Sequence, residues 1–298
     1  MTEPIRQKDI SDIKNLTRSI SLVENAVEGH ESLLQSLPAT NHAGIIGITG
    51  PPGAGKSTLV DALIGKLTEH GSTVAVLCVD PSSPFTRGAL LGDRIRMNKW
   101  HNHPGVFIRS LATRGSLGGL NPMIIEITTL LQAYGFDYII VETVGVGQSE
   151  VEIAGLADIT VVVLVPEAGD EVQTMKAGLM EIADIFVVNK GDRPDADSFM
   201  SNLLSRLGPD PGSRDRPVPV FKTIATTGEG VNELKEEICR ELADNKSGEA
   251  QISLLTEKAW QLIRQKKMKG IDRHAVAEKI TEALNKGDFQ LFQFVQQF

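Results

Sequence analysis

The chain has 298 residues, of which 41% are hydrophobic, and it carries a formal net charge of −8 at pH 7. This size allows two domains or one α/β domain with helical extensions, and the acidic balance gives no general basis for nucleic-acid binding. Two cysteines, Cys78 and Cys239, are too few for a disulfide framework. Residues 1–12 lack signal-peptide character, and the longest apolar run, residues 159–165, is too short to span a bilayer. We therefore expect a cytoplasmic protein with neither a membrane nor a nucleic-acid partner.

The first part of the chain, residues 1–42, is expected to be a helical extension. Its apolar residues at helical spacing are Ile13, Leu16, Ile20, Val23 and Val27. An alternating α/β domain should then occupy residues 43–244. Its predicted strands are 44–49, 73–79, 106–110, 138–143, 159–165, 185–188 and 218–223. Because most of these are continuous Val/Ile-rich runs, we expect a three-layer α/β fold with a mostly parallel sheet that is covered on both faces, and a ligand at the carboxyl ends of the strands.

A phosphate-binding loop follows the first predicted strand. Residues 50–58, GPPGAGKST, match the pattern GxxxxGK[ST] and precede a predicted helix at 57–70 with Leu59, Leu63 and Leu67 on one face. Glycines let the backbone amides wrap phosphates, Lys56 would reach the β- and γ-phosphates, and Ser57 would ligate Mg²⁺. The residues expected to bind the nucleotide here are Gly50, Gly53, Ala54, Gly55, Lys56, Ser57 and Thr58.

The loops after the second and fourth predicted strands should carry metal and hydrolysis chemistry. Asp80 follows the second strand and is positioned to orient Mg²⁺, directly or through water. Glu142 to Gly145 has the form of a DxxG element with Glu in place of Asp, so Glu142 could hold a metal-bound water and the Gly145 N–H could sense the γ-phosphate. Val146 stands where Ras-like GTPases have a water-orienting Gln, so intrinsic hydrolysis should be slow. Gln148 could substitute for it, or be a plain loop amide.

The base is expected to be guanine because residues 189–192 read Asn-Lys-Gly-Asp, which has the NKxD form. The Asp192 carboxylate would accept hydrogen bonds from N1–H and the 2-amino group of guanine, whereas adenine has no donor at either place. Two unpaired acceptors cost about 1–3 kcal/mol each, which gives roughly a hundredfold or greater preference for guanine. Asn189 would face O6 and N7, the Lys190 stem would lie along the purine, and a second loop at 220–230, including Ala225, would pack behind the base.

The last part, residues 245–298, is expected to be helical throughout. A basic stretch at 264–269 is typical of a solvated helix end, although it could also meet an acidic partner. Residues 289–298 end the chain with apolar side chains at helical spacing. These side chains suit either a dimer contact or packing onto the chain's own domain.

Four segments together carry a specific resemblance: VDPSS at 79–83, LGDR at 91–94, ETVGVGQSE at 142–150 and NKGD at 189–192. They resemble the MeaB/ArgK/MMAA family of P-loop GTPases, of the G3E/SIMIBI class, over nearly the whole chain. The family element usually ends in Ala-Asp, so Gly191 departs mildly from it. The resemblance implies that Lys56, Asp93 and Glu142 are catalytic, and that Ser57, Asp80, Asp93 and Glu142 hold the metal.

The resemblance also implies partners and a mechanism. Such proteins use GTP, GDP and Mg²⁺ to gate cofactor loading of an adenosylcobalamin-dependent acyl-CoA mutase and to protect it, and their C-terminal helices form a homodimer. The segment 167–173 resembles the additional switch that couples the family to its mutase. Arg94 and Arg96 could stabilise charge in the transition state or form surface salt bridges.

Two other functions remain open. A nickel- or zinc-insertion GTPase would use histidines such as His101 and His103, but neither cysteine lies near them in sequence. A transport-linked kinase, the older label attached to the ArgK name, would need a donor nucleotide. The NKGD element argues against ATP in that role.

Overall fold

The computed structural model describes residues 10–38, 43–80, 97–100, 102–114, 120–145, 152–168, 177–207, 217–244, 249–268, 270–287 and 289–296. The chain divides into two compact units, Met1–Leu254 and Leu255–Phe298. This division falls inside a helix, and the predicted boundaries at residues 42 and 244 stay predictions.

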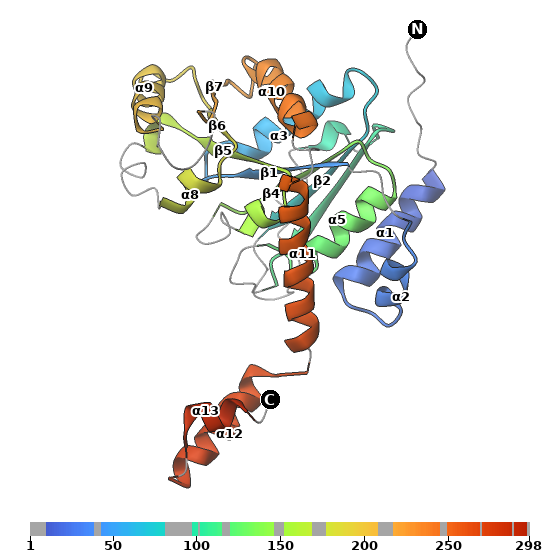
Figure 1. Ribbon diagram of the computed structural model, residues 1–298. Coiled ribbons are helices and arrows are strands. Elements are labelled where there is room, and N and C mark those ends of the chain that lie inside the picture. Colours follow the sequence, from blue (N-terminus) through green and yellow to red (C-terminus); the bar gives the residue numbers. More distant parts are fainter. Residues whose placement is uncertain are drawn as a thin grey trace. The chain divides into compact units, whose positions relative to one another are not determined.

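A seven-stranded sheet forms the centre of the first unit (Figure 1). Its strands are β1 (Gly44–Thr49), β2 (Val74–Asp80), β3 (Val106–Ala112), β4 (Tyr138–Glu142), β5 (Ile159–Leu164), β6 (Ile185–Val188) and β7 (Val220–Lys222). The strand order is β3-β2-β4-β1-β5-β6-β7, and every pairing between these strands is parallel. The predicted α/β fold is confirmed, with a sheet that is wholly rather than mostly parallel among the described strands.

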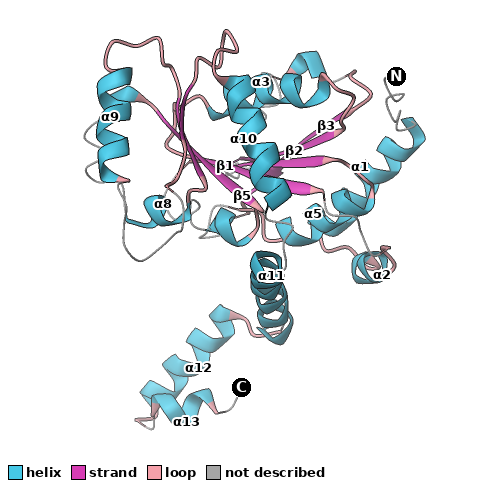
Figure 2. Ribbon diagram, turned by 45° about the horizontal axis from the view of Figure 1, so that its top comes forward, coloured by secondary structure: helices cyan, strands magenta, loops and turns pink. Residues whose placement is uncertain are grey.

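Helices cover both faces of the sheet, which makes three layers (Figure 2). One face carries α3 (Lys56–Thr68) and α10 (Val231–Asp244), and the other carries α5 (Ile124–Ala133), α8 (Ala177–Ile182) and α9 (Ala196–Arg206). Beside α5 lies α1 (Ile10–Glu24), which is followed by α2 (His30–Gln35). Short 3₁₀ turns occur at η1 (Asn98–Trp100), η2 (Ile153–Gly155) and η3 (Pro166–Ala168). Strands buried on both faces explain the continuous apolar runs in the sequence.

The predicted helix faces are buried almost as expected. Leu59, Leu63 and Leu67 of α3 all lie in the core. Leu16, Ile20 and Val23 of α1 are also buried, but Val27 lies beyond the end of α1 and is 49% exposed, so the prediction that it continues the same helical face is wrong. The reason is local: α1 ends at Glu24, and Ala26 takes a left-handed backbone conformation at φ 47° that turns the chain away.

An aspartate fixes the amino end of three strands. Asp137, Asp158 and Asp184 stand immediately before β4, β5 and β6. Their carboxylates accept backbone N–H bonds, each of 2.7 Å, from Thr73 next to β2, from Ile45 in β1 and from Thr160 in β5. The aspartate amides return hydrogen bonds to the carbonyls of the same three residues. Neighbouring strands are thereby held in register where each begins.

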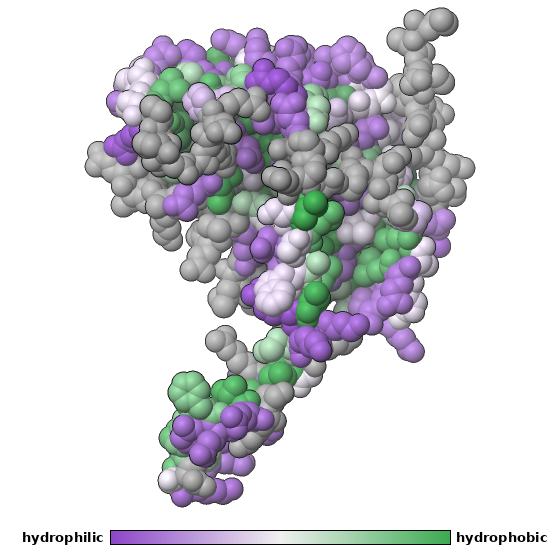
Figure 3. Space-filling view, in the orientation of Figure 1, coloured by the Kyte–Doolittle hydropathy of each residue, from purple (hydrophilic) through white to green (hydrophobic). Residues whose placement is uncertain are grey.

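The second unit contains the end of α11 (Glu249–Met268), α12 (Arg273–Asn285) and α13 (Leu291–Val295). Asp272 begins α12 by accepting hydrogen bonds from the backbone amides of His274 and Ala275. Phe294 is buried, and the centroid of its ring lies 5.7 Å from that of Phe289. Several other apolar side chains are exposed, and Figure 3 shows hydrophobic surface in this unit. No described helix is both long and apolar enough to serve as a membrane span.

Candidate nucleotide site

Three adjacent strands bring polar side chains to one edge of the sheet. Thr49 ends β1, Asp80 ends β2 and Glu142 ends β4, which lies between those two strands. All three side chains are at least 96% buried. Carboxyl ends of parallel strands are where α/β proteins bind ligands, and this edge contains the residues that the sequence predicts for phosphate and metal.

The phosphate-binding loop joins β1 to α3. Gly50 has φ 136°, and a Cβ there would lie 2.1 Å from the carbonyl oxygen of Val163, so only glycine fits. Gly55 is left-handed at φ 85° and precedes Lys56, the first residue of α3. The amides at the start of this 13-residue helix therefore face the loop, where they can bind an anion.

Lys56 is buried and its ammonium group lies within the loop. Nζ donates hydrogen bonds to the carbonyl oxygens of Gly50 at 2.8 Å and Pro51 at 3.1 Å. These two carbonyl oxygens partly compensate the buried charge and hold it against the loop.

Oxygen-bearing side chains gather beside the lysine. The Ser57 hydroxyl donates to Glu142 Oε1 at 2.6 Å, and the hydroxyls of Thr49 and Thr143 lie 2.9 Å apart. Asp80 is buried at the end of the neighbouring strand β2. Hydroxyl and carboxylate oxygens are hard donors, so the chemistry of Ser57, Asp80 and Glu142 fits Mg²⁺.

Gly145 approaches the loop from the β4 side. It has φ 79°, and a Cβ would lie 2.4 Å from both the Gly50 carbonyl oxygen and Lys56 Nζ. The backbone after Glu142 therefore touches the phosphate-binding loop and its lysine, which is the place expected for a sensor of the γ-phosphate.

Asn189 joins three loops of the site. Its amide nitrogen donates to the Ala54 carbonyl oxygen at 2.9 Å, and its Oδ1 accepts from Thr223 Oγ1 at 3.1 Å and from the Ala225 amide at 3.2 Å. The side chain thus ties the NKxD segment to the phosphate-binding loop and to the segment after β7. Sequence reasoning gave Asn189 only a contact with the base and missed this role, although Thr223 and Ala225 lie in the loop predicted to pack behind the guanine.

The rest of the NKGD segment follows at the surface. Lys190 adopts φ 56°, and the Gly191 amide donates to the Thr223 carbonyl at 2.9 Å. A Cβ on Gly191 would lie 2.6 Å from Lys222 Cγ, so a larger residue here would require the Lys222 side chain to move. Asp192 is exposed, as a carboxylate that reads an incoming base must be before the base binds.

Several predicted residues lie outside the described residues. They are Asp93, Arg94 and Arg96, Val146 and Gln148, residues 169–173 and His101. His103 is described, and its Nδ1 accepts a hydrogen bond from the Gly105 amide. Its ring packs edge-on against that of Trp100, with 5.5 Å between the ring centroids. Within the described ranges, no group of three or more His, Cys, Asp or Glu residues could hold a metal ion.

Comparison with known proteins identifies the family. Residues 16–281 match the family described as "Methylmalonyl Co-A mutase-associated GTPase MeaB". This chain belongs to the MeaB family. It is therefore a P-loop GTPase that binds GTP and GDP and hydrolyses GTP, and the family resemblance stated from the sequence motifs is confirmed.

Relatives agree with the assignment to the MeaB family. A putative GTPase of Pyrococcus horikoshii is 46% identical over 288 residues, which are 95% of this chain and 89% of that protein. Among solved structures, a LAO/AO transport system kinase matches with a TM-score of 0.70 and 26% identity, over 98% of this chain and 93% of the other. HypB from Helicobacter pylori in complex with nickel matches with a TM-score of 0.50 and 18% identity, over 79% and 98% of the two chains. The likeness to HypB concerns the fold alone.

Proposed function

We propose that this MeaB-family protein is a GTP-dependent chaperone of an adenosylcobalamin-dependent acyl-CoA mutase, methylmalonyl-CoA mutase or a close relative. GTP hydrolysis would gate loading of the mutase cofactor and protect the mutase from inactivation. The observation that carries the proposal is the family match over residues 16–281, whose description names that mutase. We also propose that the protein works in the cytoplasm as a homodimer through residues 245–298.

The phosphate end of the site would work by charge and position. Lys56 would exchange its bonds with Gly50 and Pro51 for the β- and γ-phosphate oxygens. Ser57, Asp80 and Glu142 would hold Mg²⁺, together with Asp93 as the family resemblance implies. When bound, the metal supplies positive charge that neutralises the phosphate oxygens. Ser57 would release its hydrogen bond with Glu142 to serve this role.

The base end of the site would select guanine. Asp192 is exposed in the loop after β6, where it can accept hydrogen bonds from N1–H and the 2-amino group. Asn189 would keep this segment in register with the phosphate-binding loop, because its side chain bonds to Ala54. A base without donors at these two positions would bind roughly a hundredfold more weakly.

The first test is nucleotide hydrolysis by the purified protein with GTP and with ATP, alone and with each candidate acyl-CoA mutase. We expect slow GTP turnover that rises sharply with one mutase, and no turnover of ATP. GTP turnover that ignores every mutase would refute the chaperone role and leave the GTPase. Preference for ATP would refute the role of Asp192 and favour a kinase.

A substitution sharpens the assignment of the base. Xanthine carries an oxygen where guanine carries the 2-amino group, so Asp192→Asn should lose GTP and gain xanthosine triphosphate, since an amide can donate to that oxygen. Nucleotide selectivity measured on the wild type and on this variant would separate base recognition from phosphate binding.

A further inference from the structure

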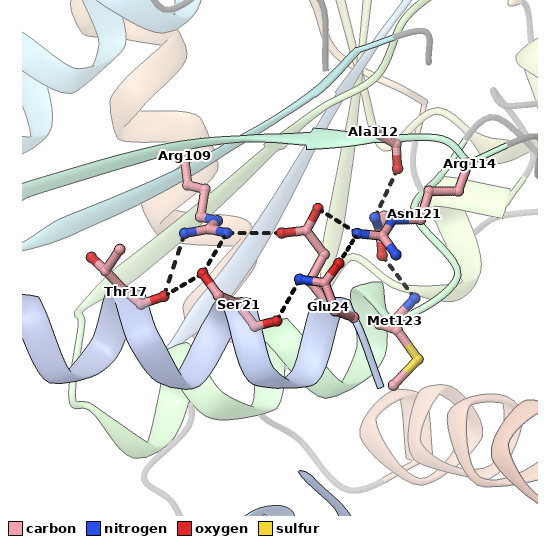
Figure 4. Close-up of polar contacts among 9 residues, drawn as sticks. Thr17, Ser21, Glu24, Arg109, Ala112, Arg114, Asn121 and Met123 are labelled. Atoms are coloured by element: carbon pink, nitrogen blue, oxygen red, sulfur yellow. Dashed lines mark hydrogen bonds and ion pairs between the residues drawn. The ribbon is translucent and has the colours of Figure 1, made fainter. Parts of the chain in front are cut away.

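The helix α1 holds two arginines of the edge strand β3 and the loop that follows it (Figure 4). Glu24 lies between them. Its Oε2 accepts a hydrogen bond from Arg109 Nη2 at 2.8 Å, and its Oε1 faces Arg114 Nη2 at 3.4 Å. One carboxylate on the N-terminal helix therefore pairs with two arginines, one on β3 and one just after it. The helical pattern of residues 1–42 does not reveal this pairing.

Other groups on α1 and just after it reinforce this cluster. Arg109 also donates to the Ser21 hydroxyl at 3.1 Å, and Arg114 donates to Asn25 Oδ1 at 2.7 Å. The side chains of Glu24 and Arg109 are only 11% and 19% exposed. Because both charges are largely removed from water, loss of Glu24 would leave Arg109 with a poorly compensated buried charge.

The backbone at Arg114 is strained. It has φ 50°, a left-handed conformation that few non-glycine residues adopt and that costs free energy for any side chain with a Cβ. The contacts of its guanidinium group with Glu24 and Asn25 offset that cost. The path of the chain after β3 thus depends on a side-chain contact with α1.

That path leads directly to the nucleotide site. Ala112 of β3 is paired with Asp80 of β2, and the Thr113 amide donates to the Asp80 carbonyl oxygen at 3.0 Å. Asn121 bonds to the Ala112 carbonyl oxygen at 2.7 Å and accepts from the Met123 amide at 2.9 Å, which fixes the other end of the loop. Asp80 is therefore one hydrogen bond and one peptide unit away from Arg114.

We infer that Glu24 is a positioning residue for the nucleotide site. By holding Arg109 and Arg114, it fixes the backbone at the carboxyl end of β3 and, through the bond between Thr113 and Asp80, the carboxylate that is proposed to serve Mg²⁺. This inference rests on the proposed role of Asp80. It gives α1 a function in nucleotide affinity in addition to packing against α5.

The test uses the full chain with Glu24→Ala, Arg114→Gly and the double variant. Glycine relieves the left-handed backbone at 114 but removes the guanidinium group, so it separates loop strain from the contact with α1. Binding of a fluorescent GDP analogue is titrated with MgCl₂, and exchange of the Thr113 amide hydrogen is followed without nucleotide. We expect both single variants to need at least about fivefold more Mg²⁺ for half-maximal binding, and to exchange the Thr113 amide faster. The double variant should add little to Glu24→Ala, because both substitutions break one chain of contacts.

The matched control is Glu28→Gln, which removes a charge at an exposed position just after α1. It should keep the wild-type Mg²⁺ dependence and exchange rate. Folded variants with a wild-type Mg²⁺ midpoint would overturn the inference while leaving the GTPase assignment intact. The inference would also be overturned if Arg114→Gly changed the midpoint and Glu24→Ala did not. If Glu24→Ala fails to fold, Glu24→Gln takes its place in the same measurements, and a folded Arg114→Gly variant with the wild-type midpoint still overturns the inference. A wild-type protein whose GDP binding ignores Mg²⁺ would instead overturn the proposed metal role of Asp80, and the inference with it.

Discussion

Gly145 and Gly135 share a backbone conformation and differ in their surroundings. Their φ angles are 79° and 74°, so a side chain at either position meets the same intrinsic penalty of about 1–2 kcal/mol. A Cβ at Gly145 would lie 2.4 Å from the Gly50 carbonyl oxygen and from Lys56 Nζ, whereas nothing lies within 4 Å of a Cβ at Gly135. The pair therefore separates backbone strain from contact with the phosphate-binding loop.

Gly145→Ala should weaken GTP binding by roughly tenfold or more, because the new methyl group must displace a loop carbonyl and the phosphate lysine. Gly135→Ala should lower the free energy of unfolding by the backbone penalty of about 1–2 kcal/mol and leave GTP affinity unchanged. Nucleotide titration and thermal unfolding of both variants measure the two effects. Equal GTP affinities in the two variants would show that Gly145 does not contact the site in solution.

At the residue scale, the sequence predicts which residues meet in the site better than how they are held. The phosphate-loop motif identifies Lys56 and Ser57, and the NKxD motif identifies Asn189, because phosphate and base binding dictate those residue types at fixed spacing. It does not reveal that Asn189 bonds to Ala54, or that Glu24 pairs with Arg109, since such contacts join segments far apart in the chain and depend on tertiary packing.

At the scale of elements, Asp158 shows how a strand end contributes to stability. Its carboxylate accepts the Ile45 amide at 2.7 Å, and Ile45 is 1% exposed. A buried backbone donor that loses its acceptor carries its full desolvation penalty, about 1–3 kcal/mol. Asp197 provides the comparison, because its side chain is 83% exposed and pairs only at the surface with Lys222.

Asp158→Ala should therefore lower the free energy of unfolding by about 1–3 kcal/mol, and Asp197→Ala by less than about 1 kcal/mol. Urea denaturation followed by circular dichroism gives both values under the same conditions. If the two variants lose equal stability, the bond from Asp158 to Ile45 is not a net stabiliser of the sheet.

The predicted strands differ from the observed ones chiefly at their ends. The runs 44–49 and 185–188 match β1 and β6, because turn residues and charges bound them sharply. Strand β3 extends to Ala112, beyond the predicted end at residue 110, and β7 covers only Val220–Lys222 of the predicted 218–223. Pairing with β2 carries β3 up to the partner of Asp80, a tertiary effect that apolar periodicity does not contain.

At the scale of the whole molecule, the second unit has more apolar surface than its own packing uses. Phe294 is buried against Phe289, whereas Phe292 is 76% exposed and Leu291 and Val295 beside it are exposed as well. The sequence leaves open whether this helical pattern packs on its own domain or on a second chain. The proposed homodimer would cover these exposed side chains of α13.

Phe292→Glu should therefore shift the protein from dimer toward monomer, because a carboxylate on a covered apolar surface loses its hydration without a partner. Gln293→Glu introduces the same charge at the adjacent exposed position and should have less effect on the dimer. Sedimentation equilibrium of the wild type and both variants gives the dissociation constants of the dimer. GTP turnover of the variants without mutase should stay within about twofold of the wild-type rate, since the substitutions lie outside the unit that contains the nucleotide site. A monomeric wild type would refute the dimer, and equal dissociation constants for all three proteins would assign its contact to another surface.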